Sequence, residues 1–461
     1  MLAGIAGRTR LRYILREMAE RERYEVDLAE WEANLFAYLV SSLSHPSAPP
    51  SVSGLTLRVA GGWVRDKLLD INTSDVDIAL DKCTGREFAE WLAKLGSTEG
   101  KEGNMKGAAS DYHVVKANPS QSKHLETATM KLFGVDVDFV NLRSETYTQG
   151  SRIPSMELGT PEEDALRRDF TINAMFYNLH TKKVEDLLGN SLQDLDGKLL
   201  RTPMNAIETF KDDPLRVMRA VRFAGRLNFD LHPDIIRACS DEGVREGLKE
   251  KVSRERVGKE FEGFFKTSSS PSLSLSWMWI CGIEDLVYSP PVDSISPSWS
   301  RVKYSKVLSD ELSKPQEVKL MYLAMPLANL GKQQFVETGK GGKEKMRSVV
   351  HCIVRDKLKL KSSDASRAQL VCGAMLKEGM RLLTAIEKKE ELTRVEVGKW
   401  VRACKEDWIV CAVIAASFRM ECCEQVRVAL AGENANGRGA AVGRKSTKPN
   451  VLLLQKPNPR P

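Results

Sequence analysis

Two carboxylates one residue apart, Asp75 and Asp77, follow closely on two adjacent glycines, Gly61 and Gly62. The apolar run before the glycines predicts a short strand, "WVRDKLL" predicts a short helix, and "VDIAL" predicts a second strand. Because residues i and i+2 of a strand project from one face, the two carboxylates could share metal ions. Adjacent glycines let backbone amides approach a ligand, and amides at a helix start favour phosphate. This combination is typical of phosphoryl or nucleotidyl transfer with two divalent ions.

A second stretch, "TPEEDALRRDFTINAM", combines a helix start with a pair of arginines. Its Thr-x-x-Glu spacing is that of a capping box, and a proline stands at the first helical position, so we expect a helix to begin here. Arg167, Arg168 and Asp169 would then lie on successive sides of one turn. Two arginines suit phosphates, and an aspartate can accept a hydrogen bond from a ribose hydroxyl. The alternative is a surface helix that carries an adjacent arginine pair.

A third stretch, "DDPLRVMRAVRF", has the periodicity of an amphipathic helix. Asp213 and Arg216 are three residues apart, so we expect them on the same side of this helix. Arg216, Arg219 and Arg222 form a basic stripe opposite apolar residues. The alternative is a solvated helix face with salt bridges.

The composition is that of a soluble globular protein with more than one domain. The chain has 461 residues, of which 42% are hydrophobic and 28% charged. A net charge of +7 fits a polyanionic partner without demanding one. Nine cysteines and six histidines lack metal-ligand spacing, which argues for reduced thiols and against a zinc site or disulfides. No apolar run approaches the length of a membrane span.

The pattern of elements predicts the α+β class, because strand signals fade and helical periodicity takes over near residue 203. We expect a helix at residues 11–40, and loops at 267–276 and 289–300. The chain divides into a helix and Ser/Pro-rich linker at 1–54, a mixed α/β domain at 55–201, helical segments at 202–267 and 268–431, and a disordered tail at 432–461.

The first sixteen residues contain four arginines and no acid. They suit an organellar presequence and equally the start of an amphipathic helix. We therefore expect a protein of the cytoplasm or nucleus, with the mitochondrion or plastid as a further compartment.

In this order along the chain, the three stretches resemble the class II tRNA nucleotidyltransferases, the CCA-adding enzymes, and most closely their plant-type members. The resemblance covers roughly Leu55 to Phe265. The family belongs to the DNA polymerase beta-like nucleotidyltransferase superfamily and adds C, C and A to the tRNA 3′ end without a nucleic-acid template. The resemblance implies an α/β head followed by an all-helical neck, body and tail. It also implies tRNA, CTP and ATP as partners, with no membrane and no protein partner.

The resemblance assigns roles within the first stretch. The glycine pair would hold the triphosphate, with Arg65 and Asp66 nearby. Asp75 and Asp77 would bind two Mg²⁺ ions, one activating the tRNA 3′-hydroxyl and one holding the triphosphate. Members of the superfamily use a third carboxylate on a neighbouring strand.

Two residues of "FGVDVDFVNLR" could supply that third carboxylate, Asp136 and Asp138. Both point to the same face of the predicted strand. The "NLR" ending, aligned on the family pattern, favours Asp138, and Asp136 is then an ordinary acid at a strand edge or an alternative ligand.

The other two stretches also acquire roles from the family. The "RRD" motif would recognise the sugar, with Asn173 assisting. The stripe that begins at Asp213 would read the incoming base; Asp212 stands where many bacterial members have glutamate, which leaves the reading pair intact. "VSRERVGKEF" resembles an architectural motif, so Arg256 and Glu260 receive no chemistry. Residues 142–159 would form a flexible loop that couples nucleotide addition to domain closure.

Binding of tRNA would fall to basic residues between Lys340 and Lys361. The candidates are Arg347, Arg355, Lys357 and Lys359. Three other functions fit parts of the pattern: a poly(A) polymerase of the same superfamily, a catalytically weak tRNA-binding protein, and a generic nucleotide-binding module.

Overall fold

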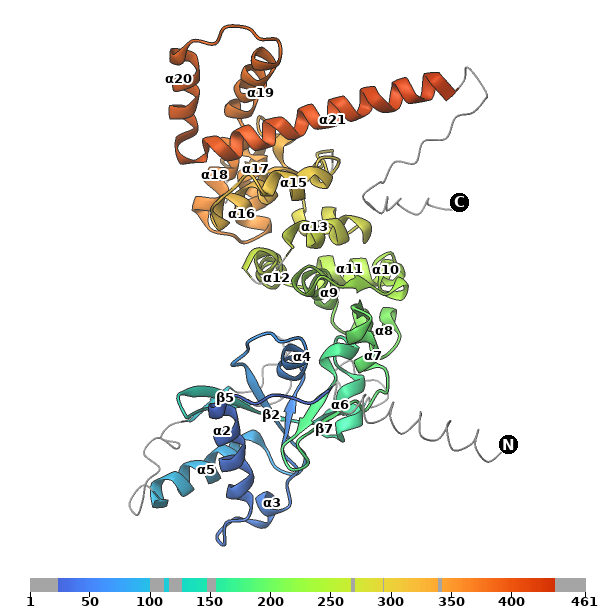
Figure 1. Cartoon of the computed structure of the whole chain (residues 1–461), viewed down its shortest axis with the longest axis vertical. Helices are drawn as coiled ribbons and strands as arrows, with labels where there is room; N and C mark the ends of the chain where they lie inside the picture. Colours follow the sequence, from blue (N-terminus) through green and yellow to red (C-terminus); the bar gives the residue numbers. More distant parts are fainter. Residues whose placement is uncertain are drawn as a thin grey trace, which may run out of the picture. The chain divides into compact units, whose positions relative to one another are not determined.

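The computed structural model describes residues 24–99, 112–115, 127–146, 155–266, 270–292, 294–338 and 342–435. The chain divides into two compact units, Met1–Ala206 and Ile207–Pro461. Figure 1 colours the first unit from blue to green and the second from green to red. Within the described ranges, no helix is long and apolar enough to cross a membrane.

A seven-stranded sheet with the strand order β3-β4-β5-β2-β1-β8-β9 forms the centre of the first unit. β2 and β5 pair in parallel, whereas the other neighbours are antiparallel. The strands of this sheet are β1 (Arg58–Ala60), β2 (Val76–Leu80), β3 (Tyr112–Val115), β4 (Thr127–Leu132), β5 (Val135–Asn141), β8 (Phe176–Asn178) and β9 (Lys183–Glu185).

Short helices surround this sheet. They are α2 (Glu30–Leu43), α3 (Pro50–Ser53), α4 (Gly62–Leu68), α5 (Gly85–Glu99), α6 (Pro161–Leu166), the 3₁₀ turn η2 (Thr171–Asn173) and α7 (Ser191–Asp196). α5 contacts β4 and β5, and the ring of Phe88 lies edge-on to that of Phe139 with the ring centres 5.1 Å apart. A short strand, β10 (Leu199–Leu200), follows α7.

The N-terminal segment is part of the first unit and differs from the prediction at residues 1–54. The expected helix begins only at Glu30, because residues 24–29 are not helical; residues 1–23 lie outside the described chain. The expected linker contains the end of α2 and all of α3. Leu43 and Val52 within it are buried, because a Ser/Pro-rich segment can still bury its few apolar side chains.

Edge-on and tilted aromatic contacts hold α2 in place. The rings of Phe36, Trp63 and Tyr177 lie 5.5–6.3 Å apart, joining α2, α4 and β8. Such pairs contribute about 0.5–1.5 kcal/mol each beyond the area they bury.

The expected flexible loop at 142–159 begins and ends as an antiparallel pair, β6 (Arg143–Thr146) and β7 (Ser155–Leu158). Residues 147–154 between them lie outside the described chain. The Gly, Ser and Thr content suggested a loop, but both ends of the segment form paired strands.

The second unit is largely helical (Figure 1). Its helices are α8 (Ala206–Asp212), α9 (Leu215–Leu227), α10 (Pro233–Cys239), α11 (Glu242–Glu250), α12 (Arg254–Lys266), α13 (Pro271–Ile280), α14 (Glu284–Tyr288), α15 (Ser305–Ser309), α16 (Pro315–Ala324), α17 (Val349–Cys352), α18 (Ser362–Cys372), α19 (Ala374–Glu387), α20 (Arg394–Cys404) and α21 (Trp408–Ala435). The unit also contains short turns and a short strand: η3 (Val302–Tyr304), η4 (Ala328–Leu330), the π-helical η5 (Ile353–Lys357), η6 (Lys405–Asp407) and β11 (Asp230–Leu231).

Three features of this unit differ from the prediction. The serine-rich loop expected at 267–276 contains the start of α13, where Pro271 takes the first helical position and Leu275 is buried. The region expected to be all helical contains a hairpin, β12 (Gln334–Thr338) and β13 (Glu344–Ser348). α21 extends past residue 431 to Ala435, and residues 436–461 lie outside the described chain.

The α+β class is confirmed: a sheet in the first unit and mostly helices in the second. The seven cysteines whose side chains are described are free thiols. Burial raises the pKa of the Cys83 thiol to about 12, with Glu87 and Asp81 nearby adding to the effect, so this thiol stays protonated at neutral pH.

Candidate active site

The predicted metal-binding carboxylates gather where β2 and β5 run in parallel. Asp77 and Asp138 are direct neighbours in the register, and Asp75 immediately precedes β2. Neighbours in register project from the same face of a sheet, so Asp138 lies beside Asp77. The hydroxyl of Thr129 donates a 2.5 Å hydrogen bond to Asp138, which fixes that carboxylate.

Asp136 has a different neighbourhood. It is exposed and stands opposite Lys131 of β4. Asp138 is partly buried and anchored by Thr129. The register therefore favours Asp138 as the third carboxylate.

Carboxylate oxygens are the donors that Mg²⁺ prefers, and this ion commonly takes only one or two carboxylates together with water and substrate phosphates. Asp75 and Asp77 suit that mode of binding. Across the part of the chain that the structure describes, no three or more His, Cys, Asp or Glu side chains form a group able to hold a metal ion. Two carboxylates suit an ion whose remaining ligands come from nucleotide and water.

The glycine turn between β1 and α4 requires glycine at its first position. Gly61 has φ of 67°, and a Cβ there would lie 2.3 Å from Nη1 of Arg168. The amide of Gly61 is already used, since it donates to the carbonyl of Met175 at 2.9 Å. Gly62 is the first residue of α4, where amides lack an intrahelical partner. The amide of Gly62 is therefore the better candidate for contact with a phosphate.

The "RRD" motif lies just beyond its helix. The predicted capping box is present, with Glu163 N–H donating to Thr160 Oγ1 at 3.2 Å. α6 ends at Leu166, however, so the prediction that the three motif residues share one helical turn is wrong. Beyond the helix the chain passes through the buried Phe170 into the turn η2.

Arg168 is held firmly in this turn. Its Nε and Nη2 donate to Asp164 at 3.0 and 2.8 Å, and Nη1 donates to the carbonyl of Asn173 at 3.1 Å. The guanidinium also lies 5.1 Å from the ring centre of Phe176. Arg168 therefore closes the glycine turn from the other side. Arg167, the C-cap residue that follows α6, is partly exposed.

A buried chain of polar contacts connects the glycine turn with the "RRD" motif. Arg65 is 2% exposed and binds Asp66 at 2.7 Å, while its Nη1 donates to the side-chain oxygen of Asn173. The amide of Asn173 in turn donates to Asp169 at 2.9 Å. Burial turns Arg65 and Asp66 toward the protein interior, so they support the site, and Asp169 forms its partly exposed end.

Sequence reasoning missed a buried carboxylate, Glu32, that supports α4. Glu32 is 1% exposed, accepts from the indole of Trp63 at 3.0 Å and pairs with Lys67 at 2.5 Å. Trp63 and Lys67 both belong to α4. The sequence does contain a signal: Glu32, Leu35 and Leu39 share one helical face, so the glutamate stands among apolar residues.

The predicted base-reading residues are placed differently than expected. Asp213 lies between α8 and α9, one residue before Pro214, so it is not on the helix that carries Arg216. Proline disfavours helical geometry in the residue before it, which explains the break. The carboxylate of Asp213 accepts from the Leu215 amide at 3.2 Å and from Nη2 of Arg256 at 3.1 Å.

The "VSRERVGKEF" segment, for which the sequence predicts no chemical role, contacts Asp213 and the arginine stripe of α9. Arg256 pairs with Asp213, and Glu260 accepts from Nε of Arg222 at 2.6 Å. Arg222 also lies 4.4 Å from the ring centre of Phe223. Arg219 is 3.9 Å from Glu260. Sequence reasoning missed these contacts of Arg256 and Glu260, because the partners lie about forty residues apart.

The predicted tRNA contacts divide into two groups. Arg347 donates to both oxygens of Glu337 at 2.9 Å and pairs with Asp356 at 2.6 Å, while Lys359 pairs with Glu255 at 3.2 Å. These hydrogen bonds raise the pKa of Arg347. The side chains of the other two candidates, Arg355 and Lys357, make no ion pair with any described residue.

The sequence profile of the Poly A polymerase head domain matches residues 57–201. This range contains the glycine turn, the carboxylates and the "RRD" motif. The chain is 37% identical over 391 residues to the mitochondrial CCA tRNA nucleotidyltransferase of Saccharomyces cerevisiae, an alignment that covers 77% of this chain and 70% of that protein.

Solved structures show the same fold. The Thermotoga maritima CCA-adding enzyme complexed with tRNA aligns with a TM-score of 0.55 and 20% identity, over 84% of this chain and 79% of that one. A CCA-adding enzyme complexed with CTP aligns with a TM-score of 0.55 and 20% identity, over 86% and 80% of the two chains. The identity and coverage shared with the Saccharomyces enzyme show that this chain belongs to the CCA tRNA nucleotidyltransferases.

Proposed function

We propose that this chain adds C, C and A to the 3′ end of tRNA from CTP and ATP, without a nucleic-acid template, and releases pyrophosphate. The observation that carries the proposal is the register of β2 and β5. It sets Asp77 beside Asp138, with Asp75 two residues before Asp77. Membership of the family and the tRNA and CTP complexes of similar structures support the substrate class.

The reaction is an in-line attack of the 3′-hydroxyl oxygen on the α-phosphorus, with pyrophosphate as the leaving group. Asp75 and Asp77 would hold two Mg²⁺ ions, which supply activation of the hydroxyl and neutralisation of the triphosphate. Thr129 keeps Asp138 oriented toward this face through its 2.5 Å hydrogen bond. The amide of Gly62 would contact the triphosphate.

Sugar recognition would fall to Asp169, whose carboxylate can accept a hydrogen bond from a ribose hydroxyl. The buried contacts from Arg65 through Asn173 hold this carboxylate in place, so little ordering is needed when nucleotide binds. Arg167 and Arg168 would provide positive charge beside the phosphates.

Base selection would use Asp213 and Arg216. Cytosine presents an amino donor beside a ring-nitrogen acceptor, and adenine presents the same pair. A carboxylate can accept from the amino group while a guanidinium donates to the ring nitrogen. Uracil and guanine present the reverse order, so acceptor would face acceptor and donor would face donor. Each unpaired group costs about 1–3 kcal/mol.

Ion pairs hold Asp213 of this pair and the two arginines that follow Arg216 on the same stripe. Arg256 holds the carboxylate of Asp213. Glu260 holds Arg222, one helical turn and a half along α9 from Arg216, with Arg219 between them.

Primer extension tests the function. A tRNA that ends at the discriminator base is incubated with CTP, ATP, UTP and GTP singly and in pairs. We expect two C additions with CTP alone and a completed CCA end with CTP and ATP. A long A tail with ATP alone would identify a poly(A) polymerase instead. Binding of tRNA without extension would identify a catalytically weak tRNA-binding protein. Nucleotide binding that does not depend on a primer would identify a generic nucleotide-binding module.

For the compartment we propose the cytoplasm or nucleus, with import into the mitochondrion or plastid directed by the first sixteen residues. A fluorescent fusion of the full chain tests this when compared with a variant that has alanine at four positions: Arg8, Arg10, Arg12 and Arg16. Equal distribution of the two fusions would remove the import part of the proposal.

A further inference from the structure

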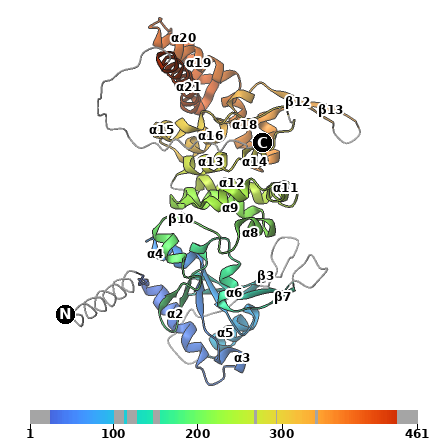
Figure 2. The same ribbon diagram turned by 90° about the vertical axis from the view of Figure 1, so that its right-hand side faces the viewer.

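The hairpin β12–β13 extends from the helices of the second unit and is firmly attached at its base (Figure 2). The Val349 amide donates to Gln333 O at 3.1 Å, and the side-chain amide of Gln369 on α18 donates to Gly331 O at 2.9 Å. A Cβ on Gly331 would lie only 1.5 Å from the carbonyl oxygen of Cys372, so only glycine fits there. An isolated two-stranded ribbon is marginal alone, and these contacts fix its direction.

The two faces of the hairpin differ in character. Residues paired across an antiparallel ribbon share a face, so Glu337 and Lys345 lie together, with Arg347 on the same face. On the other face Val336 and Met346 stand opposite each other, 52% and 57% exposed.

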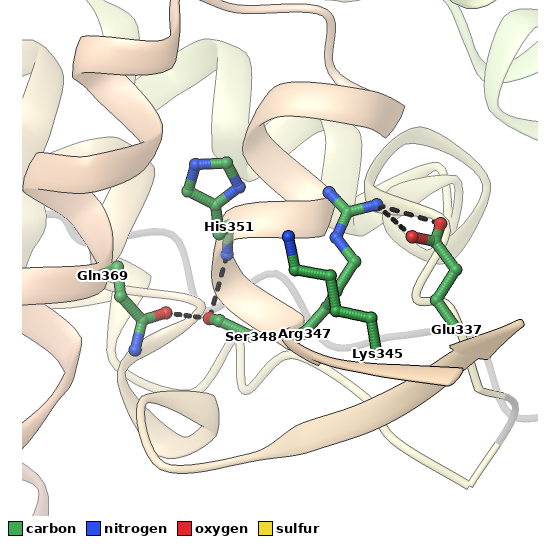
Figure 3. A pocket seen from close by; sticks show the side chains of 6 residues that line it. All are labelled: Glu337, Lys345, Arg347, Ser348, His351 and Gln369. Carbon is green, nitrogen blue, oxygen red and sulfur yellow. Dashed lines mark hydrogen bonds and ion pairs between the residues drawn. The ribbon is translucent and has the colours of Figure 1, made fainter. Parts of the chain in front are cut away.

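The charged face borders a cavity of about 480 Å³ (Figure 3). The lining residues come from both strands and from the helices α17 and α18: Glu337, Lys345, Arg347, Ser348, His351 and Gln369. This volume is within the range of cavities that bind small groups.

Most polar groups around the cavity already have partners. Arg347 neutralises Glu337, and the Ser348 hydroxyl donates to the side-chain oxygen of Gln369. By contrast, neither the ammonium of Lys345 nor the ring of His351 makes a hydrogen bond or ion pair with any described residue, although both line the cavity (Figure 3). Unused donors beside a neutralised carboxylate suit an anion.

Charge along the hairpin favours an extended anion over a single small one. Between residues 332 and 348 the chain has five basic residues and two acidic ones. The basic residues are Lys332, Lys340, Lys343, Lys345 and Arg347. Of these, Lys332 and Lys343 are exposed and make no ion pair with any described residue.

We propose that this cavity binds a phosphate group of the tRNA backbone, through the ammonium of Lys345 and the ring N–H of His351. The inference rests on the proposed function for the identity of the RNA. The same chemistry could come from the phosphates of a free nucleotide, and the experiment separates the two sources.

The test measures the affinity of the full chain for tRNA as a function of KCl concentration. We expect Lys345→Ala to reduce the slope of log K against log salt by about 0.7–0.9, the loss of one phosphate contact. His351→Gln should weaken tRNA binding with a smaller change in slope. KM for CTP should remain at the wild-type value in both. The control is Lys388→Ala, which removes a lysine whose side chain is 65% exposed and pairs with Glu390 at 3.9 Å; it should leave the slope unchanged.

An unchanged slope for Lys345→Ala overturns the inference. A raised KM for CTP with an unchanged slope would identify a free-nucleotide site instead. Lys345→Arg keeps the charge and should restore the slope, whereas a merely structural role of Lys345 would not distinguish arginine from alanine in this way. If the wild-type chain binds tRNA with the expected slopes and yet adds no nucleotide, the proposed function fails and the phosphate site stands.

Discussion

The two units use charged side chains in different ways. In the first unit Arg65 and Glu32 are 2% and 1% exposed, and both are enclosed by partners that link α4 to its neighbours. In the second unit Asp213 and Arg256 pair at side-chain exposures of 26% and 32%, and Lys345 is exposed. Buried charges keep a geometry fixed, because removing one partner leaves the other unsatisfied. Exposed charges remain available to bases and phosphates.

The largest effect that this comparison predicts concerns the carboxylates of the first unit. Asp77→Asn should lower both C and A addition at least about a hundredfold, because charge at the reacting phosphate would no longer be stabilised. Binding of tRNA should remain nearly intact, since the proposed tRNA contacts lie in the second unit. Single-turnover CTP incorporation measures the effect, and retention of more than about a tenth of the activity would contradict the metal assignment.

Asp138 and Asp136 form a matched pair for the same assay. Asp138→Asn should reduce nucleotide addition as Asp77→Asn does, because the two residues are neighbours in register. Asp136→Asn should keep most of the activity. The reverse ranking would transfer the third carboxylate to Asp136.

The second effect concerns stability. Glu32→Ala should lower the free energy of unfolding by about 3 kcal/mol, because Lys67 and the indole of Trp63 lose a buried acceptor. Urea unfolding monitored by tryptophan fluorescence measures it. Glu30→Ala, an exposed glutamate on the same helix, is the control and should change stability by no more than about 0.5 kcal/mol. Equal losses in the two variants would mean that Glu32 supports nothing specific.

The third effect is on selectivity. Asp213→Ala should slow the use of CTP and ATP and reduce discrimination against UTP and GTP by about 1–3 kcal/mol. Arg256→Ala should reduce selectivity in the same direction but less, since it removes only the support of Asp213. Competition between CTP and UTP at equal concentration measures both. Wild-type selectivity in Asp213→Ala would show that this residue only forms a surface ion pair, which is worth a few tenths of a kcal/mol.

Local patterns in the sequence predicted what local geometry decides. The glycine turn at Gly61, the capping box of Thr160 with Glu163, and the strand that follows Asp75 are all present. Each depends on residues within about four positions, where backbone preferences and short hydrogen bonds dominate.

What the sequence did not reveal depends on distant partners. Arg65 and Asn173 are 108 residues apart, Asp213 and Arg256 are 43 apart, and Glu32 and Trp63 are 31 apart. No periodicity links such positions, so the burial of Arg65 and its bond to Asn173 could not be predicted from the sequence. The hairpin β12–β13 was missed for a local reason, because its two strands have only five residues each and a mostly polar composition.

The smallest effect sharpens the distinction between an occupied and an available charge. Arg347 was predicted from the sequence to contact tRNA, but Glu337 and Asp356 already neutralise its guanidinium. Hydrogen bonds to these carboxylates raise the pKa of Arg347, so it stays protonated wherever the protein is folded and no titration enters the comparison. Arg347→Gln should therefore change the salt slope of tRNA binding by less than Lys345→Ala does, with a stability loss within about 1 kcal/mol. Salt titrations of both variants under one protocol decide the matter. A larger slope change for Arg347→Gln would mean that tRNA displaces the two carboxylates, and the charge on this face would then be available after all.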